Sequence, residues 1–359
     1  MMQNNQAIPF NKENFKAIFS KEFALVIIIS VPSAIVAEFF NIPLAWFLGP
    51  MLITSLASLM GLKTKMPKLV LSSILILLGL YIGNYIDKSL FSQIHQWAWT
   101  SLIMLVYIII SVLIVSRYLQ IFSKYDKKTS IFSAAPGALG PLMILAEDEK
   151  SDLSQVATSH LIRLIIIITV FPFIVNSFYD VENIKIAEEI IKEQNIFHLI
   201  LLIISSIVLI IIFDKFRIPA ALLSGTLFAS GFLQISEIAS YQLPPNIIDY
   251  CLLILGASVG CRFANKTFSE IARNALHSFV ATFLLVLLGL LAAFAASLII
   301  DKNFFTLLLS YCPGGIYEVA VIAIFFDLDP EFVSFHHIIR LLMILFIVPL
   351  ILRIIEKKT

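Results

Sequence analysis

Long runs of apolar residues, separated by short polar stretches, organise the whole chain. The runs lie near 22–40, 44–61, 69–86, 99–118, 130–146, 156–178, 196–213, 218–235, 247–263, 278–300, 306–326 and 332–352. Most approach the length of about 20 residues that an α-helix needs to cross a bilayer. None shows the regular alternation of apolar and polar residues that a transmembrane β-barrel requires. The pattern predicts an all-α polytopic membrane protein.

Composition supports this prediction. Of the 359 residues, 59% are hydrophobic and only 14% are charged, which is too few charges to cover a soluble domain of this size. The lipid bilayer is therefore an expected partner. A net charge of +1 gives no general attraction for nucleic acid, and no nucleic-acid partner is expected. The three cysteines form no CxxC pair, so we expect free thiols and no zinc site.

The twelve runs fall into two sets of six, and the second set repeats the first. The repeated positions are Pro136-Gly137 and Pro313-Gly314, Asp152 and Asp329, His160 and His337, Arg163 and Arg340, and Pro172 and Pro349, each pair 177 positions apart. The pairs Gly79 with Gly256 and Gly83 with Gly260 have the same spacing. We therefore predict an N-terminal segment over 1–21, a first membrane repeat over 22–178, a linker over 179–195 and a second repeat over 196–355.

The distribution of Lys and Arg predicts the orientation of the chain. With twelve crossings, the loops hold 16 Lys and Arg residues inside and 7 outside; if the fifth segment of each repeat enters and leaves on the same side, the numbers are 19 and 4. The second arrangement is favoured, because each fifth segment also carries a helix-breaking Pro-Gly pair. It predicts inverted repeats with about 10 crossing helices, two broken re-entrant segments and both termini in the cytoplasm.

Two arginines lie inside apolar runs, each three residues after a histidine. His337 and Arg340 share one helix face, as do His160 and Arg163. Arg340 lies roughly 15 Å along its helix at 1.5 Å per residue, where a charged side chain costs on the order of 3 kcal/mol. Either each arginine binds carbonyl groups that the neighbouring Pro-Gly break leaves free, or the pair forms an anion-binding or ion-coupling site.

Glu318 follows the break of the second repeat, whereas Pro141 stands at the matching position of the first. The carboxylate of Glu318 could carry a proton through a transport cycle, or it could form a permanent structural salt bridge. The expected substrate- or ion-binding residues are Pro313, Gly314, Gly315, Glu318, His337 and Arg340, with Pro136, Gly137, His160 and Arg163 as their counterparts. We predict no catalytic residue, metal site or cofactor. His336 and His337 are adjacent, so their side chains diverge on a helix.

The segment CPGGIYEVAVIAIFFDLDPEFVSFHHIIRLL, residues 312–342, resembles the signature of the membrane proteins with the AbrB duplication, a family also labelled ammonia monooxygenase. Residues 135–164, APGALGPLMILAEDEKSDLSQVATSHLIRL, resemble a degenerate copy that departs from the signature at Ala138 and Pro141. The resemblance implies a duplicated integral protein of the inner membrane, in some cases described as a regulator of gene expression.

These observations favour a secondary transporter that moves a small-molecule or ion substrate by alternating access. The two intramembrane arginines favour an anion. A membrane regulator or sensor that affects gene expression is the alternative. An enzyme of the ammonia monooxygenase type is the least favoured, because a convincing set of copper or iron ligands is missing from the sequence. The expected location is the bacterial inner (plasma) membrane, and homo-oligomerisation is left open.

Overall fold

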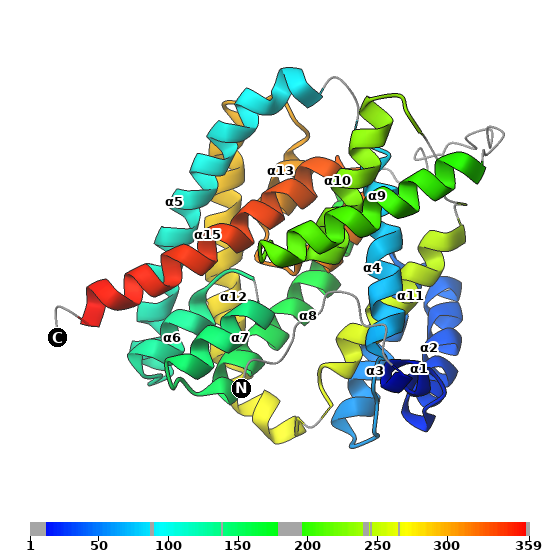
Figure 1. Ribbon diagram of the computed structural model, residues 1–359. Helices are drawn as coiled ribbons and strands as arrows, with labels where there is room; N and C mark the ends of the chain where they lie inside the picture. The colour runs from blue at the N-terminus through cyan, green and yellow to red at the C-terminus, as the bar shows by residue number, and fades with distance from the viewer. Residues whose placement is uncertain are drawn as a thin grey trace. The chain divides into compact units, whose positions relative to one another are not determined.

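The computed structural model describes residues 12–86, 90–137, 139–178, 196–239, 244, 246–264 and 266–356, and all regular structure in these ranges is α-helical (Figure 1). Six helices are long and apolar enough to cross a membrane: Asn14–Phe39, Gln96–Phe122, Leu153–Phe178, Phe197–Lys215, Phe268–Ser297 and Pro330–Ile354. Shorter apolar helices lie between them. The predicted all-α polytopic membrane fold is confirmed, while the predicted linker over 179–195 lies outside the described residues.

Helix α9 (Ile196–Lys215) illustrates why these helices suit a bilayer. Only 17% of its most apolar 18-residue stretch is buried within the protein. Its outward face consists of large aliphatic side chains that are each about half exposed: Ile200, Ile203, Ile204, Ile207, Val208 and Ile211. Such a continuous apolar surface would be unfavourable in water, whereas lipid tails cover it without cost.

The chain forms two compact units, and each unit takes helices from both repeats. The first unit comprises Met1–Leu90, Pro172–Thr267 and Ile324–Glu331. The second comprises Phe91–Phe171, Phe268–Ala323 and Phe332–Thr359. The compact units therefore cut across the division into residues 22–178 and 196–355 that the repeat defines in the sequence.

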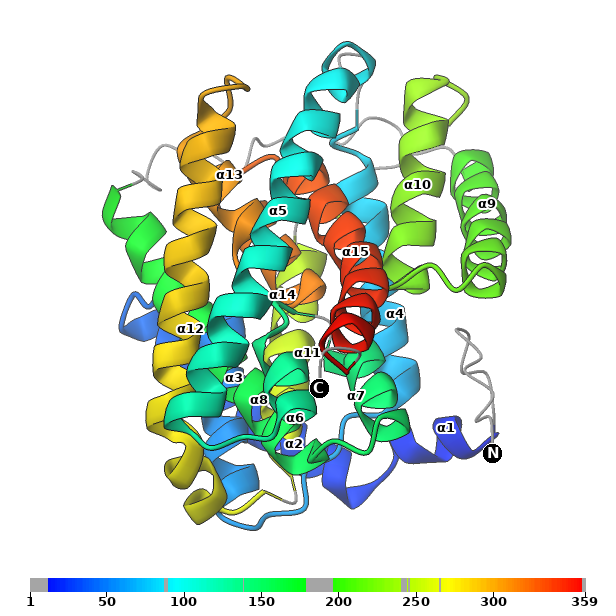
Figure 2. The ribbon, with the colours of Figure 1, turned by 90° about the vertical axis from the view of Figure 1, so that its left-hand side faces the viewer.

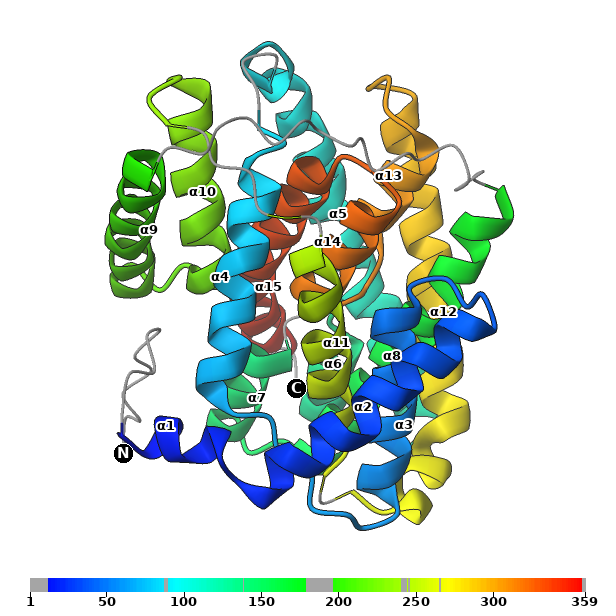
Figure 3. The same cartoon turned by 90° about the vertical axis from the view of Figure 1, so that its right-hand side faces the viewer.

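The first unit contains α1 (Lys12–Ile18), α2 (Lys21–Phe39), α3 (Ala45–Leu59), α4 (Lys68–Gly83), α9, α10 (Ala221–Ile235) and α11 (Asn246–Cys261). Helix α3 packs on α11, and α4 packs on α10 (Figure 3). A Cβ atom at Gly79 would lie 2.5 Å from the Leu223 carbonyl oxygen, and one at Gly256 would lie 2.2 Å from that of Phe47. These small residues allow close helix contact, and the equivalent contact occurs twice, each time between one helix from each repeat.

The second unit contains α5 (Leu90–Phe122), α6 (Lys127–Ala134), α7 (Leu139–Asp148), most of α8 (Leu153–Phe178), α12 (Phe268–Ser297), α13 (Phe304–Tyr311), most of α14 (Ile316–Phe325) and most of α15 (Pro330–Glu356). Helices α5 and α12, which occupy equivalent places in the repeats, lie side by side (Figure 2). The Tyr107 hydroxyl donates to the Leu285 carbonyl at 3.4 Å, and the Tyr118 hydroxyl lies 3.2 Å from His277 Nδ1. Since later residues of α5 contact earlier residues of α12, the two helices are antiparallel. This direction confirms inverted repeats.

Each Pro-Gly segment is a broken helical hairpin. Hairpin 1 is α6, which ends at Ala134, and α7, which begins at Leu139; hairpin 2 is α13 and α14, interrupted at 312–315. Both begin with a side-chain cap: Asp126 accepts from the Thr129 N–H at 2.9 Å, and Asn303 accepts from the Phe305 N–H at 2.8 Å. The predicted breaks at Pro136-Gly137 and Pro313-Gly314 are confirmed.

The hairpins enter and leave the second unit at one end, as the charge distribution predicts. In hairpin 1, Lys128 Nζ lies 2.7 Å from Glu149 Oε2, which joins the beginning of α6 to the end of α7. In hairpin 2, Lys302 Nζ lies 5.5 Å from the centre of the Phe332 ring, so a residue two positions before α13 contacts the first turn of α15. With 10 residues, α7 is about 15 Å long, which is half the thickness of a bilayer core of about 30 Å.

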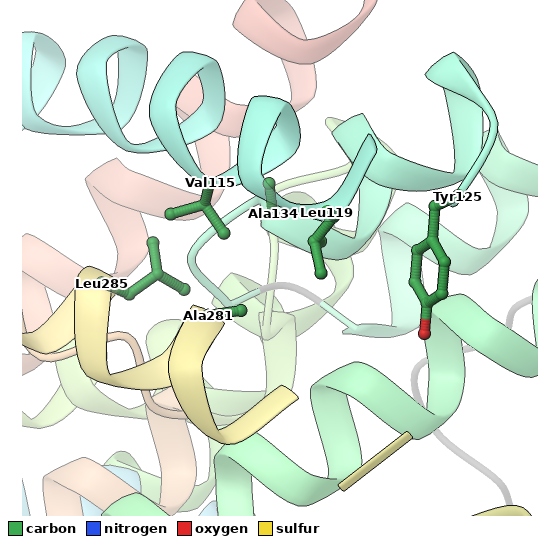
Figure 4. Close-up of a cluster of buried hydrophobic side chains, with 6 residues drawn as sticks. All are labelled: Val115, Leu119, Tyr125, Ala134, Ala281 and Leu285. Atoms are coloured by element: carbon green, nitrogen blue, oxygen red, sulfur yellow. The ribbon is translucent and has the colours of Figure 1, made fainter. Parts of the chain in front are cut away.

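A buried hydrophobic cluster fixes the inner end of α6. Ala134, the last residue of α6, packs with Val115 and Leu119 of α5 and with Ala281 and Leu285 of α12 (Figure 4). All five side chains are at most 2% exposed. The tip of hairpin 1 is thus held between equivalent helices of the two repeats.

Candidate functional site

Two buried arginines bind the carbonyl groups at the ends of α6 and α13. Arg340 of α15 donates from Nη1 to the Cys312 carbonyl and from Nη2 to the Gly314 carbonyl, the latter at 2.6 Å. Arg163 of α8 donates from Nη1 to the Ala135 carbonyl at 2.6 Å and from Nη2 to the Ser133 carbonyl. Arg340 is 0% exposed and Arg163 is 1% exposed.

These hydrogen bonds follow from the helix breaks. The last four carbonyl groups of a helix, and those of the non-helical residues that follow it, have no partner within that helix, and leaving such groups unpaired in an apolar interior is costly. A guanidinium offers several donors in one plane, so it can bind two carbonyls that are two residues apart, as in both repeats here. The hydrogen bonds expected if each arginine binds carbonyl groups left free by the Pro-Gly break are therefore present in both repeats. The ion-binding interpretation stays a prediction.

The histidines reinforce the same connection. His160 Nε2 lies 3.0 Å from the Phe132 carbonyl oxygen, and His337 Nε2 lies 3.0 Å from that of Leu309. A carbonyl only accepts, so Nε2 carries the proton in both rings. His337 Nδ1 then accepts from Arg340 Nη2 at 3.1 Å. In each repeat the histidine and the arginine bind residues 28 positions earlier, which explains their spacing of three.

The tips of the two hairpins meet within the second unit. Gly137 of hairpin 1 has a φ of +96°, and a Cβ atom there would lie 2.7 Å from Arg340 Nη2 and 3.2 Å from the Gly314 carbonyl oxygen. Glycine satisfies both constraints, since it tolerates a positive φ and leaves room for the guanidinium. Three of the predicted site residues, Gly137, Gly314 and Arg340, are thereby brought together.

Glu318 lies at the beginning of α14. It is the third residue of this helix and is 1% exposed. Its carboxylate covers Gly315, where a Cβ atom would lie 2.0 Å from Oε2. The hydrogen bonds of Arg163 and Arg340 go to main-chain carbonyls and to His337, and neither guanidinium has a carboxylate partner among the described residues. A carboxylate at this place is favourable because the first turn of a helix carries a partial positive charge.

A second polar chain in the same unit was not anticipated from the sequence. His336 Nε2 lies 2.8 Å from the Thr100 hydroxyl, and the Tyr311 hydroxyl donates to the Thr100 carbonyl at 2.7 Å. The Tyr107 ring packs edge-on against Tyr311, with 6.2 Å between their centres. The available signal was the position of Thr100 and Tyr107 inside a long apolar run. His336 and His337 do point to different partners, as predicted.

Within the described ranges, the structure places no three His, Cys, Asp or Glu side chains close enough together to hold a metal ion. The three cysteines are free, with Cys251 and Cys312 buried and Cys261 partly exposed. This agrees with the expected free thiols.

Comparison with known proteins gives a consistent result over most of the chain. Residues 2–83 and 46–356 match a family described as "Transition state regulatory protein AbrB". The chain is similar to "Uncharacterized protein YhjN" of Bacillus subtilis (strain 168), with 22% identity over 304 residues that cover 79% of each chain. It is also similar to "Putative regulator AbrB" of Escherichia coli (strain K12), with 22% identity over 318 residues that cover 88% of this chain and 91% of the relative. No solved structure matches.

Proposed function

The chain belongs to the AbrB family, and from this premise we propose that it carries a small solute across the membrane by alternating access. Inverted repeats whose broken segments meet near mid-depth form, in many secondary transporters, one binding site that can open to either side. The observation that carries the proposal is the meeting of the two hairpin tips at Gly137 and Gly314 beside the buried Arg340.

The charge at the tips supports an anion as the solute. Two guanidinium groups lie in a region of low dielectric, where each charge acts more strongly than in water. Their hydrogen-bond partners are uncharged carbonyls and an imidazole. The proposed binding residues are Pro313, Gly314, Gly315, Glu318, His337, Arg340, Pro136, Gly137, His160 and Arg163.

For the cellular location, we propose a bacterial inner membrane with both termini in the cytoplasm. Re-entrant hairpins support the arrangement that puts 19 Lys and Arg residues inside and 4 outside. A cysteine introduced at position 188, in an otherwise cysteine-free variant, should react with an impermeant reagent from the periplasmic side. Reaction from the cytoplasmic side alone would overturn this orientation.

Uptake into proteoliposomes tests the transport function. Purified protein should take up at least one radiolabelled anion from a set of acetate, succinate, phosphate and sulfate faster than protein-free liposomes do. Arg340→Lys should lose this uptake, because an ammonium cannot reproduce the planar contact to two carbonyls. Uptake equal to that of protein-free liposomes for all four anions, under gradients of either direction, would contradict the proposal.

A membrane regulator is the second candidate, and the observation that favours it is the printed description of the family and of the Escherichia coli relative. Neither relative named above carries the name of an enzyme. Deletion of the gene followed by transcript measurement distinguishes the two functions when it is complemented with Arg340→Lys. A regulator independent of transport would still restore the transcript pattern with a variant that has lost uptake.

A further inference from the structure

The two hairpins differ at one position, which decides whether a carboxyl group lies at the tip. Helix α14 has Glu318 in its first turn, and this carboxylate covers Gly315. Helix α7 has no acidic residue in its first turn, and its third residue is Pro141, which is 177 positions before Glu318. The beginning of α14 therefore holds a carboxyl group of its own, while the beginning of α7 has none.

The beginning of α7 also has space beside it. A Cβ atom at Gly140 would meet no heavy atom within 4 Å, although Gly137, three residues earlier, lies against Arg340 and Gly314. The first N–H groups of a helix have no partner inside the helix, and Pro141 contributes no N–H group. A ligand could approach the N–H groups of Leu139 and Gly140 without displacing a side chain near Gly140.

Buried polar atoms near this tip lack partners. Arg340 Nε and Arg163 Nε both lack a hydrogen-bond partner among the described residues, but only the Arg340 guanidinium, which is 0% exposed, lies against the glycine of the opposite hairpin, Gly137. The Ser133 hydroxyl, at the end of α6, is likewise unpaired within the described part of the chain and 0% exposed. Its counterpart Ser310 donates to the Thr306 carbonyl at 2.8 Å, so the equivalent group of hairpin 2 is satisfied.

From these differences we infer that the beginning of α7 is the binding site for the carboxylate group of a small organic acid. The carboxylate of Glu318 occupies the equivalent place at α14, which gives the chemical class that this geometry accepts. The N–H groups of Leu139 and Gly140, the partial positive charge of α7 and the Arg340 guanidinium all favour a negative charge there. This assignment specifies the chemical class of the anion in the proposed transport function. It rests on that function for the claim that the bound acid is transported, but binding itself can be tested separately.

The first part of the test is carboxylate binding by the wild-type protein; the second places in hairpin 1 the acidic side chain that hairpin 2 already has. Acetate and succinate serve as probes, with chloride at equal ionic strength as the control, and binding to the purified wild-type protein is measured by calorimetry and by thermal unfolding. Saturable binding of at least one carboxylate, without an equal effect of chloride, is expected. Absence of saturable binding for both carboxylates would overturn the inference.

Pro141→Glu should reduce the affinity for the carboxylate by about tenfold or more, since its own carboxylate would compete for the same N–H groups. The midpoint of thermal unfolding without ligand should rise, because an acidic third residue favours the first turn of a helix. Pro141→Gln is the matched neutral control and should bind nearly as the wild type does. Equal affinities of the Glu and Gln variants would overturn the inference, and the opposite directions of stability and affinity separate competition from misfolding.

The same variants distinguish this inference from the transport proposal. Loss of binding in Pro141→Glu combined with no uptake of any of the four anions by wild-type proteoliposomes would support the site and contradict transport. Carboxylate uptake that Pro141→Glu leaves unchanged would support transport and contradict the site.

Discussion

Hairpin 1 and hairpin 2 are two copies of one device, and they differ mainly at their tips. In both, a capped short helix ends at a Pro-Gly break, and an arginine from the following long helix binds the freed carbonyls. In hairpin 2 the first turn of the next helix carries Glu318, whereas in hairpin 1 that turn has no acidic residue. The shared features show that a helix break inside a membrane requires a buried donor for the carbonyl groups that it leaves free. The part that differs is where we propose that a ligand binds.

Replacing the arginines should produce the largest effects. Arg340→Ala leaves the Cys312 and Gly314 carbonyls unpaired, at about 1–3 kcal/mol each. Removal of a buried guanidinium recovers about 3 kcal/mol, so the protein should stay folded in the membrane while uptake disappears. Arg163→Ala should retain more uptake, since the contact across the two tips is made by Arg340. The measurements are uptake and thermal unfolding of both variants. Equal uptake by the two would remove the distinction between the hairpins.

The glycines of the two tips should respond unequally to alanine. Gly137→Ala places a Cβ atom 2.7 Å from Arg340 Nη2 on a backbone with a φ of +96°, and we expect a loss of about 2 kcal/mol in the free energy of unfolding. At Gly314 the new atom would meet the Val319 Cγ2 atom at 2.5 Å, and this side chain can shift, so a loss of about 1 kcal/mol is expected. Denaturant unfolding of both variants in detergent checks the order. A larger loss at Gly314 would contradict it.

His337→Ala should destabilise the protein more than His160→Ala. Each loses one buried hydrogen bond to a carbonyl, but His337 also accepts from Arg340. The additional bond to a charged donor predicts a difference of about 1 kcal/mol between the two variants. A double-mutant cycle that combines His337→Ala with Arg340→Lys measures this coupling directly. A coupling energy near zero would show that the contact contributes nothing.

The smallest effect on stability is expected for Glu318→Gln, at about 0.5–1 kcal/mol, because the carboxylate loses its interaction with the helix terminus while an amide keeps much of the shape. Its effect on uptake separates two roles. If Glu318 carries a proton, the dependence of uptake on the pH gradient should flatten while carboxylate binding persists. A loss of about 3–5 kcal/mol would instead indicate that the charge is a necessary partner of a buried group.

The sequence predicts the parts of this site better than their connections. A spacing of 177 residues identifies the duplicated Pro-Gly breaks and the His-Arg pairs without any structure. The acceptors of Arg163 and Arg340 are main-chain carbonyls, which every residue has, so no residue type marks them in advance. The contact of Thr100 with His336 joins positions 236 residues apart, and no pattern in a single sequence indicates it.

Division of the chain into compact units was also beyond sequence reasoning. The repeat suggests a boundary between residues 178 and 196, but α3 packs on α11 and α4 on α10. These contacts depend on glycines that admit a neighbouring backbone, such as Gly79 and Gly256, and glycine is common in membrane helices for many reasons. Only their spacing of 177 residues hints that the two contacts are equivalent.

The order of the hairpins along the chain bears on how the protein is made. In each repeat the short helices precede the helix that carries the arginine, since residues 127–148 come before α8 and residues 304–325 come before α15. During synthesis, the carbonyl acceptors therefore reach the membrane before the guanidinium that binds them. The arginine adds about 3 kcal/mol to the cost of inserting its helix on its own. A hairpin that is already in the membrane can offset that cost, because its carbonyl groups bind the guanidinium as the helix enters. A circular permutation that placed either hairpin after its arginine would leave a charge in lipid until the rest of the repeat was translated.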